Sequence, residues 1–114
     1  MPSSRQKFGT QAEDRAAQFL QSKGFTILDR HVTSRYGEID LLAEDQDTVV
    51  AVEVKARRST AFGRAIEAIT PTKYEKIAAA LHDTLEQRGW QNRPYRIDAV
   101  TIDGAVIEHH PSIG

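Results

Sequence analysis

The chain has 114 residues, of which 39% are hydrophobic and 27% are charged, and its formal net charge is −1. This length fits a single domain, residues 1–114, and the composition argues against a disordered or fibrous protein. The longest apolar run has five residues, whereas a membrane span needs about 18, and the absence of cysteine excludes disulfides and thiolate metal sites. We therefore expect a cytoplasmic protein without membrane spans.

The charge alternates along the chain. Residues 1–37 carry a net charge of +3, residues 38–54 carry −6, residues 55–96 carry +5 and residues 97–114 carry −3. An acidic block between two basic ones suits a cation site flanked by surfaces that bind a polyanion. Ordinary solvated surface charge explains the same pattern, so both interpretations stay open.

The first half of the chain predicts a helix and three strands. The helix is expected over residues 10–23, because Ala12, Ala16 and Leu20 follow helical spacing and Gly24 supplies a stop. Polar turns separate the strands, which are expected over residues 25–30, 37–43 and 48–56. The last two strands are expected to form a hairpin.

The second half predicts a helix and two further strands. Thr70-Pro71 combines an N-cap residue with proline at the first helical position, so a helix is expected from there to about Gly89. Residues 57–69 before it are expected to form a mobile loop. Strands over residues 95–102 and 105–108 complete the order α-β-β-β-α-β-β, which indicates an α+β fold with a mixed central sheet flanked by helices.

The third predicted strand places an acid and a base where its apolar part ends. The residues before Glu53 are apolar on both faces, as in a strand covered on both sides, so Glu53 and Lys55 are expected at the rim of a cleft. If the hairpin loop is centred on residues 46–47, Asp40 lies directly opposite Glu53. A shift of one residue would separate the two carboxylates. We expect the first helix to cover the face that carries them.

Glu13 falls inside the apolar stripe of the first predicted helix, close in projection to Ala16 and Leu20. A glutamate in such a stripe is either paired with another side chain for structural reasons or faces the same cleft as the other carboxylates. The residues alone leave both alternatives open.

These residues are part of a longer series of motifs. The series consists of Gly9, Glu13, Gly37-Glu38-Ile39-Asp40, residues 52–57 (VEVKAR), Phe62-Gly63 and Lys73. Over residues 7–102 it closely resembles the bacterial YraN family. That family in turn looks like the PD-(D/E)xK nuclease superfamily, and most like its archaeal-type Holliday junction resolvases. The resemblance implies a restriction-endonuclease-like fold.

The resemblance also implies a catalytic set, which maps onto Glu13, Asp40, Glu53 and Lys55. Asp40 and Glu53, with the Val54 carbonyl, would hold one or two Mg²⁺ or Mn²⁺ ions, and Glu13 would hold a metal-bound water or a second ion. Lys55 would orient the water or stabilise the transition state. The implied activity is that of a metal-dependent endonuclease acting on DNA, selective for branched forms and working as a homodimer.

Several basic residues are candidates for phosphate contacts: Arg30, Arg35, Arg57, Arg58, Arg64 and Lys73. For each one alone, exposed surface charge is the competing interpretation. His109 and His110 are interpreted as inert residues of a frayed tail. Two rival functions stay open. One is a nucleic-acid-binding adaptor that keeps the nuclease fold without turnover, and the other is a purely structural interaction domain.

Overall fold

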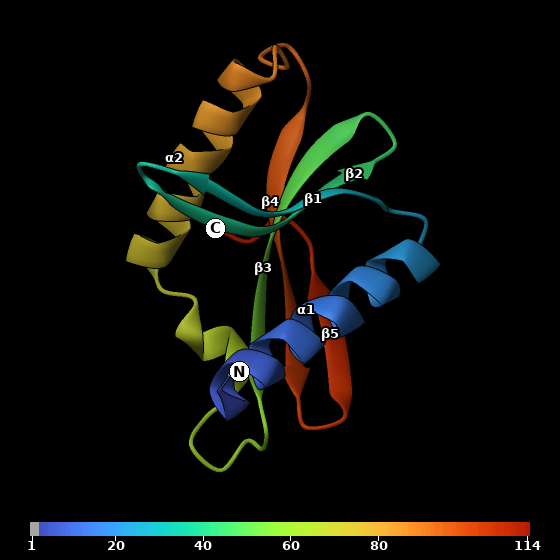
Figure 1. The fold of residues 1–114 in the computed structure, drawn as a ribbon, viewed down its shortest axis with the longest axis vertical. Coiled ribbons are helices and arrows are strands. Elements are labelled where there is room, and N and C mark those ends of the chain that lie inside the picture. The colour runs from blue at the N-terminus through green and yellow to red at the C-terminus, as the bar shows by residue number, and fades with distance from the viewer. Residues whose placement is uncertain (1–2) are drawn as a thin grey trace.

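The computed structural model describes residues 3–114, and its elements follow the predicted order (Figure 1). The helices are α1 (Ser4–Ser22), the short 3-10 helix η1 (Ala65–Ala68) and α2 (Pro71–Gln87). The strands are β1 (Thr26–Ser34), β2 (Gly37–Asp45), β3 (Thr48–Arg57), β4 (Tyr95–Asp103) and β5 (Val106–His110). None of the helices in this part of the chain combines the length and apolar character needed to span a membrane.

All five strands form one open sheet in the order β1-β2-β3-β4-β5. Strands β1, β2 and β3 are joined as an antiparallel meander, and β5 is antiparallel to β4. The central pair β3–β4 is parallel, and α2 lies in the connection between these two strands. The predicted α+β fold with a mixed sheet is therefore confirmed.

Each face of the sheet is covered by one helix. Helix α1 buries Ala16 and Leu20 against alternate residues of the central strands, and α2 buries Ile77 and Leu81 against the other face. Along β3 the sets are Val50, Val52 and Val54 under α1, and Val49 and Ala51 under α2. The apolar character of β3 on both faces thus reflects two cores, as its sequence predicts.

The two helices begin with capping residues, but only one start was predicted correctly. Helix α2 follows Thr70, whose hydroxyl accepts a hydrogen bond from the Lys73 N–H at 3.2 Å. Helix α1 begins at Ser4, well before the expected start. Ser3 accepts a hydrogen bond from the Gln6 N–H (3.2 Å), and the Gln6 side chain accepts one from the Ser3 N–H (2.8 Å). This capping box adds an extra turn and a half to the helix.

Two expectations about loops and ends are wrong. The segment expected to be a mobile loop contains η1, where Ala65 is buried and its N–H donates to the Asp103 carboxylate at 2.8 Å. The C-terminal histidines do not lie in a frayed tail. They belong to β5, where the His109 ring lies 2.7 Å from the buried Asp98 and the His110 ring lies 2.8 Å from the Thr101 hydroxyl. Side-chain bonds to β4 therefore hold the end of the sheet.

Candidate active site

The β2–β3 hairpin has the register predicted from the sequence, with backbone pairing up to Leu41↔Val52. The next position in this register brings Asp40 opposite Glu53. Beyond the last backbone pair, the Asp40 carboxylate accepts a hydrogen bond from the Val54 N–H at 2.9 Å. The side chain of Asp40 thus substitutes for the backbone of β2 at the point where the two strands part.

The sheet is irregular at this point. Leu41 packs under α1, whereas both Leu42 and Ile39 pack under α2, so the alternation of β2 breaks at Asp40. In β1, His31 lies between the residues that pair with Leu41 and Ile39 and has a φ of +52°, a value uncommon for a residue other than glycine. The break in alternation lets the Asp40 carboxylate reach across to β3.

Glu53 is a buried carboxylate beside a second carboxylate. Its residue is only 3% exposed. Burial raises the pKa of Glu53 to about 8, and the hydrogen bond and charge of Asp40 add to the effect. Two ammonium groups oppose it, with Lys55 Nζ 3.9 Å from one Glu53 oxygen and Lys73 Nζ 3.8 Å from the other. Because both distances exceed a hydrogen bond, the lysines offset the effect of burial only in part, and the pKa of Glu53 stays raised.

The helix over this face is α2, so the expectation that the first helix would cover it is wrong. Glu53 alternates with Val52 and Val54, both of which pack under α1, and it therefore faces the opposite side of β3. Lys73, in the first turn of α2, reaches Glu53 from that side. Sequence reasoning treated Lys73 only as a phosphate contact, since helix packing could not be read from the strand pattern.

Glu13 approaches the site from α1 but is paired with His31. The His31 ring lies 2.8 Å from Glu13 and 3.0 Å from Glu38. Burial raises the pKa of Glu13, and the charge of Asp40 adds to this. The hydrogen bond to Glu38 raises the pKa of His31. Glu13 thus pairs with His31, and its pKa also responds to the charge of Asp40. The pairing of His31 was not predicted, because its partners lie in α1 and in the neighbouring strand β2.

The donor set fits a divalent cation in part. Carboxylate oxygens are the ligands that Mg²⁺ and Mn²⁺ prefer, and a cation between Asp40 and Glu53 would favour the ionised form of the buried Glu53 carboxylate. Within residues 3–114, however, no three acidic or histidine side chains are grouped closely enough to hold one ion. The residues that fit a metal are Asp40 and Glu53, and the role expected of Glu13, to hold a metal-bound water or a second ion, stays a prediction.

Three of the six predicted phosphate-binding residues have other partners on the surface. These contacts are Arg30 to Asp14 at 2.5 Å, Arg64 to Glu108 at 3.3 Å, and Arg35 to the Tyr36 hydroxyl at 2.8 Å. Exposed pairs of this kind contribute little to stability and open readily, at roughly 0–1 kcal/mol each.

The other three contact Glu53 or lie at the end of β3. Lys73 contacts Glu53, as described above. Arg57 is the last residue of β3, and Arg58 follows it and stacks on the Phe8 ring at 4.3 Å. Both arginines are exposed. The end of β3 therefore carries the basic surface nearest in sequence to the acidic pair.

Comparison with known proteins identifies the family. Residues 12–102 match the model of an uncharacterised protein family, UPF0102. The chain is 43% identical to a UPF0102 protein of Nitrosococcus oceani over 89% of this chain and 82% of the relative. It is 43% identical to one from Neisseria gonorrhoeae over 86% and 85% of the two chains, and 38% identical to one from Sulfurihydrogenibium over 85% and 84%. The chain therefore belongs to the UPF0102 family.

Proposed function

We propose that the protein is a Mg²⁺- or Mn²⁺-dependent endonuclease that hydrolyses phosphodiester bonds in DNA, with selectivity for branched forms. The observation that carries the proposal is the pairing of Asp40 with a buried Glu53, between two lysines, where β2 and β3 part. A buried carboxylate with a strongly raised pKa is more typical of a functional site than of a structural ion pair.

The proposed roles follow from these contacts. Asp40 and Glu53 would hold the ion, which when bound neutralises charge on the scissile phosphate and activates water. Lys55 is partly exposed beside Glu53, so its ammonium can stabilise negative charge that develops on the phosphate in the transition state. Lys73 would help to bind the same phosphate from the opposite side of Glu53. Glu13, which pairs with His31, would hold a metal-bound water or a second ion at the edge of the site.

A second candidate function is a DNA-binding adaptor without turnover. The observation in its favour is that, in residues 3–114, Glu13 does not join the acidic pair as a third ligand. Such a protein would bind nucleic acid through the basic end of β3 and would leave it intact.

The test is a cleavage assay on labelled duplex, flap, single-stranded and four-way-junction DNA with Mg²⁺ or Mn²⁺. Glu53→Ala should abolish cleavage, because it removes a metal ligand. Lys55→Ala should reduce cleavage by about 10² to 10³ while leaving DNA binding largely intact. Lys76→Gln, on the exposed side of α2, removes the same positive charge as Lys55→Ala. It is the control and should cleave normally. Binding without cleavage on the whole panel supports the adaptor, and cleavage that survives Glu53→Ala means a contaminating nuclease.

The proposal includes a homodimer, because a branched or duplex substrate presents two strands and this chain offers one candidate site. Light scattering at tens of micromolar, with and without DNA, measures this directly. A monomer under both conditions would contradict paired cleavage by two subunits.

A further inference from the structure

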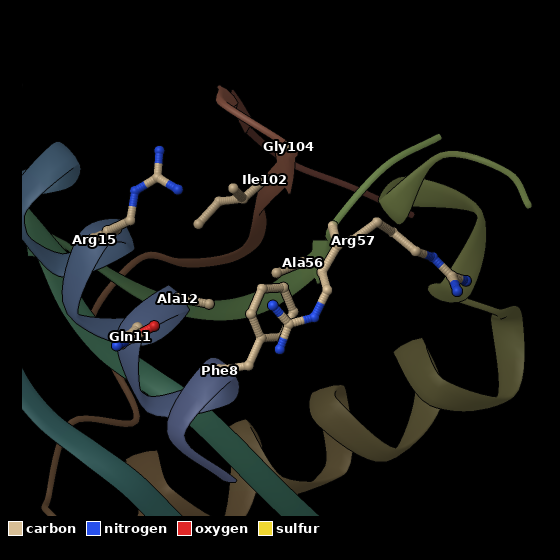
Figure 2. A pocket seen from close by; sticks show the side chains of 9 residues that line it. Phe8, Gln11, Ala12, Arg15, Ala56, Arg57, Ile102 and Gly104 are labelled. Atoms are coloured by element: carbon tan, nitrogen blue, oxygen red, sulfur yellow. The ribbon is translucent and has the colours of Figure 1, made fainter. Parts of the chain in front are cut away.

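A cavity lies at the end of β3, on the α1 face of the sheet. It has a volume of about 290 Å³ and lies between the first half of α1, the end of β3 and the turn between β4 and β5 (Figure 2). Its lining residues are Phe8, Gln11, Ala12, Arg15, Ala56, Arg57, Arg58, Ile102 and Gly104. We call this the arginine pocket. Its floor is apolar, and Gly104, with a φ of +62°, places no side chain in it.

The charge of this pocket is unbalanced. Its lining contains three arginines and no acid. Other arginines do have carboxylate partners within the described residues 3–114, namely Arg30, Arg64, Arg88, Arg93 and Arg96. In the same part of the chain, Arg15, Arg57 and Arg58 have none. Arg58 is held instead against the Phe8 ring, 4.3 Å from its centre, which leaves guanidinium N–H groups free for an anion.

The arginine pocket and the candidate active site use neighbouring residues of two elements, but the pocket lies on the α1 face of the sheet and Glu53 on the α2 face. Ala12 lines the pocket and Glu13 follows it in α1. Ala56 lines the pocket and Lys55 precedes it in β3. In Figure 2, Arg57 points away from Phe8 towards the segment that leads into α2, the helix that covers the Glu53 face. Basic groups therefore continue from the site around the end of β3 into the pocket.

We propose that the arginine pocket binds a backbone phosphate of the nucleic-acid strand whose scissile bond lies at Asp40 and Glu53. This inference rests on the proposed function for its ligand. Guanidinium groups bind phosphate through paired charged hydrogen bonds, and a strand that passes from the Glu53 face around the end of β3 would meet these arginines on the α1 face. The pocket would thus set the direction in which the nucleic-acid strand leaves the candidate active site.

The test measures binding without turnover, by fluorescence anisotropy of labelled single-stranded and flap DNA in EDTA. Arg58→Gln and Arg15→Gln should each weaken binding about tenfold, as expected for one charged hydrogen bond. Each should also reduce the slope of log affinity against log salt by about 0.7 on a single strand. Arg88→Gln removes the same charge at the end of α2 and is the matched control, with near-normal affinity.

A second variant leaves all the arginines in place. Gln11→Glu puts a negative charge into the pocket without a change of shape, whereas Gln18→Glu makes the same change at another exposed position of α1. Gln11→Glu should weaken binding about tenfold and Gln18→Glu should have little effect. Because both positions are exposed, neither change should unfold the protein, which a thermal melt verifies.

A scan with neutral methylphosphonate linkages locates the contacted phosphate. In the wild type, one linkage near the cleavage position should lower affinity about tenfold when neutral, and Arg58→Gln should be insensitive to that same linkage. Wild-type affinity in Arg58→Gln and Gln11→Glu would overturn the pocket assignment, as would equal competition by free inorganic phosphate and by DNA, which would indicate a small-anion site. Cleavage together with normal binding in these variants defeats only the pocket. Position-specific binding without any cleavage defeats only the nuclease.

Discussion

Two buried carboxylates, Asp98 in β4 and Glu53 in β3, are accommodated in different ways. Asp98 is fully buried, and both of its carboxylate oxygens have hydrogen-bond partners in the protein. The Arg96 guanidinium donates at 2.9 and 3.2 Å, the His109 ring lies at 2.7 Å, and the Ser112 N–H donates at 2.9 Å. This site is closed, because the protein itself supplies the partners of both oxygens.

Glu53 lacks such a set of close donors. Its nearest ammonium groups, from Lys55 and Lys73, are 3.8 to 3.9 Å away, and its close neighbour is another acid, Asp40. Burial therefore raises the pKa of Glu53, whereas donors surround Asp98. The comparison teaches that burial of an acid does not mark a functional site by itself. What marks it is burial without enough donors, which leaves the carboxylate ready for an outside cation or proton.

The largest expected effect is on stability at the closed site. Asp98→Ala should lower the free energy of unfolding by about 3–5 kcal/mol, because the partly buried Arg96 keeps only Asp45 as an acidic partner and the His109 ring and Ser112 N–H lose their acceptor. Glu53→Gln should change it by less than about 1 kcal/mol at pH 7, where Glu53 is already largely protonated. Urea denaturation at pH 7 measures both values. Equal losses in the two variants would remove the distinction drawn above.

The next effect is the dependence of stability on pH in EDTA. Glu53 has a pKa near 4.5 in the unfolded chain and about 8 in the fold, so the folded state binds more protons between these values. Its contribution to the free energy of unfolding is therefore complete below about pH 4.5 and is lost as the pH rises to 8, by an amount on the order of 4 kcal/mol.

The matched control for this titration is Glu53→Gln, which cannot ionise. The difference in unfolding free energy between the wild type and Glu53→Gln should drift in favour of the variant between pH 5 and pH 8 and level off above that range. A difference that stays flat over this range would mean that Glu53 ionises normally in the fold.

A smaller effect is expected from metal addition. At ten times its dissociation constant, Mg²⁺ should stabilise the wild type by about 1.4 kcal/mol, a rise of several degrees in Tm. Asp40→Asn should lose most of this gain, because one of the two acidic groups is gone. Differential scanning fluorimetry with and without Mg²⁺ or Mn²⁺ gives the result. Equal shifts in both proteins would place the ion elsewhere.

The smallest effect concerns Lys73, whose charge lowers the pKa of Glu53. Lys73→Gln should therefore raise that pKa further and extend the loss of stability to higher pH, by less than about 1 kcal/mol because the lysine side chain is 42% exposed. Lys76→Gln, one turn further along α2, is the control and should leave the titration unchanged. Identical profiles for the two variants would show that the contact with Glu53 is too weak to matter.

The hairpin that carries the acidic pair could be predicted because its determinants are local. The short turn at residues 46–47 fixes the register, and the register fixes which residues face each other. The pairing of Asp40 with Glu53 followed from this turn position. The helix over them did not, because apolar stripes on α1 and α2 fit either face of a strand that is apolar on both sides.

The closed site could not be predicted, because its members come together only through tertiary packing. Arg96 and Asp98 are neighbours in β4, but His109 and Ser112 reach Asp98 from β5 and the residues after it. Two adjacent histidines near a chain end carry no signal of this arrangement. The start of α1 is a different case, since Ser3 and Gln6 have the spacing of a capping box and the signal was overlooked.

The parallel pairing of β3 with β4 also orders events during synthesis. Strands β1, β2 and β3 are consecutive and joined by tight turns, so they can associate as soon as they have left the ribosome. Asp40 and Glu53 then meet before α2 has been made. Until β4 arrives, one whole edge of β3 has unpaired backbone groups, and an exposed apolar edge is a site of aggregation. The edge of β3, the strand that carries Glu53, is thus the part of the growing chain most exposed to aggregation.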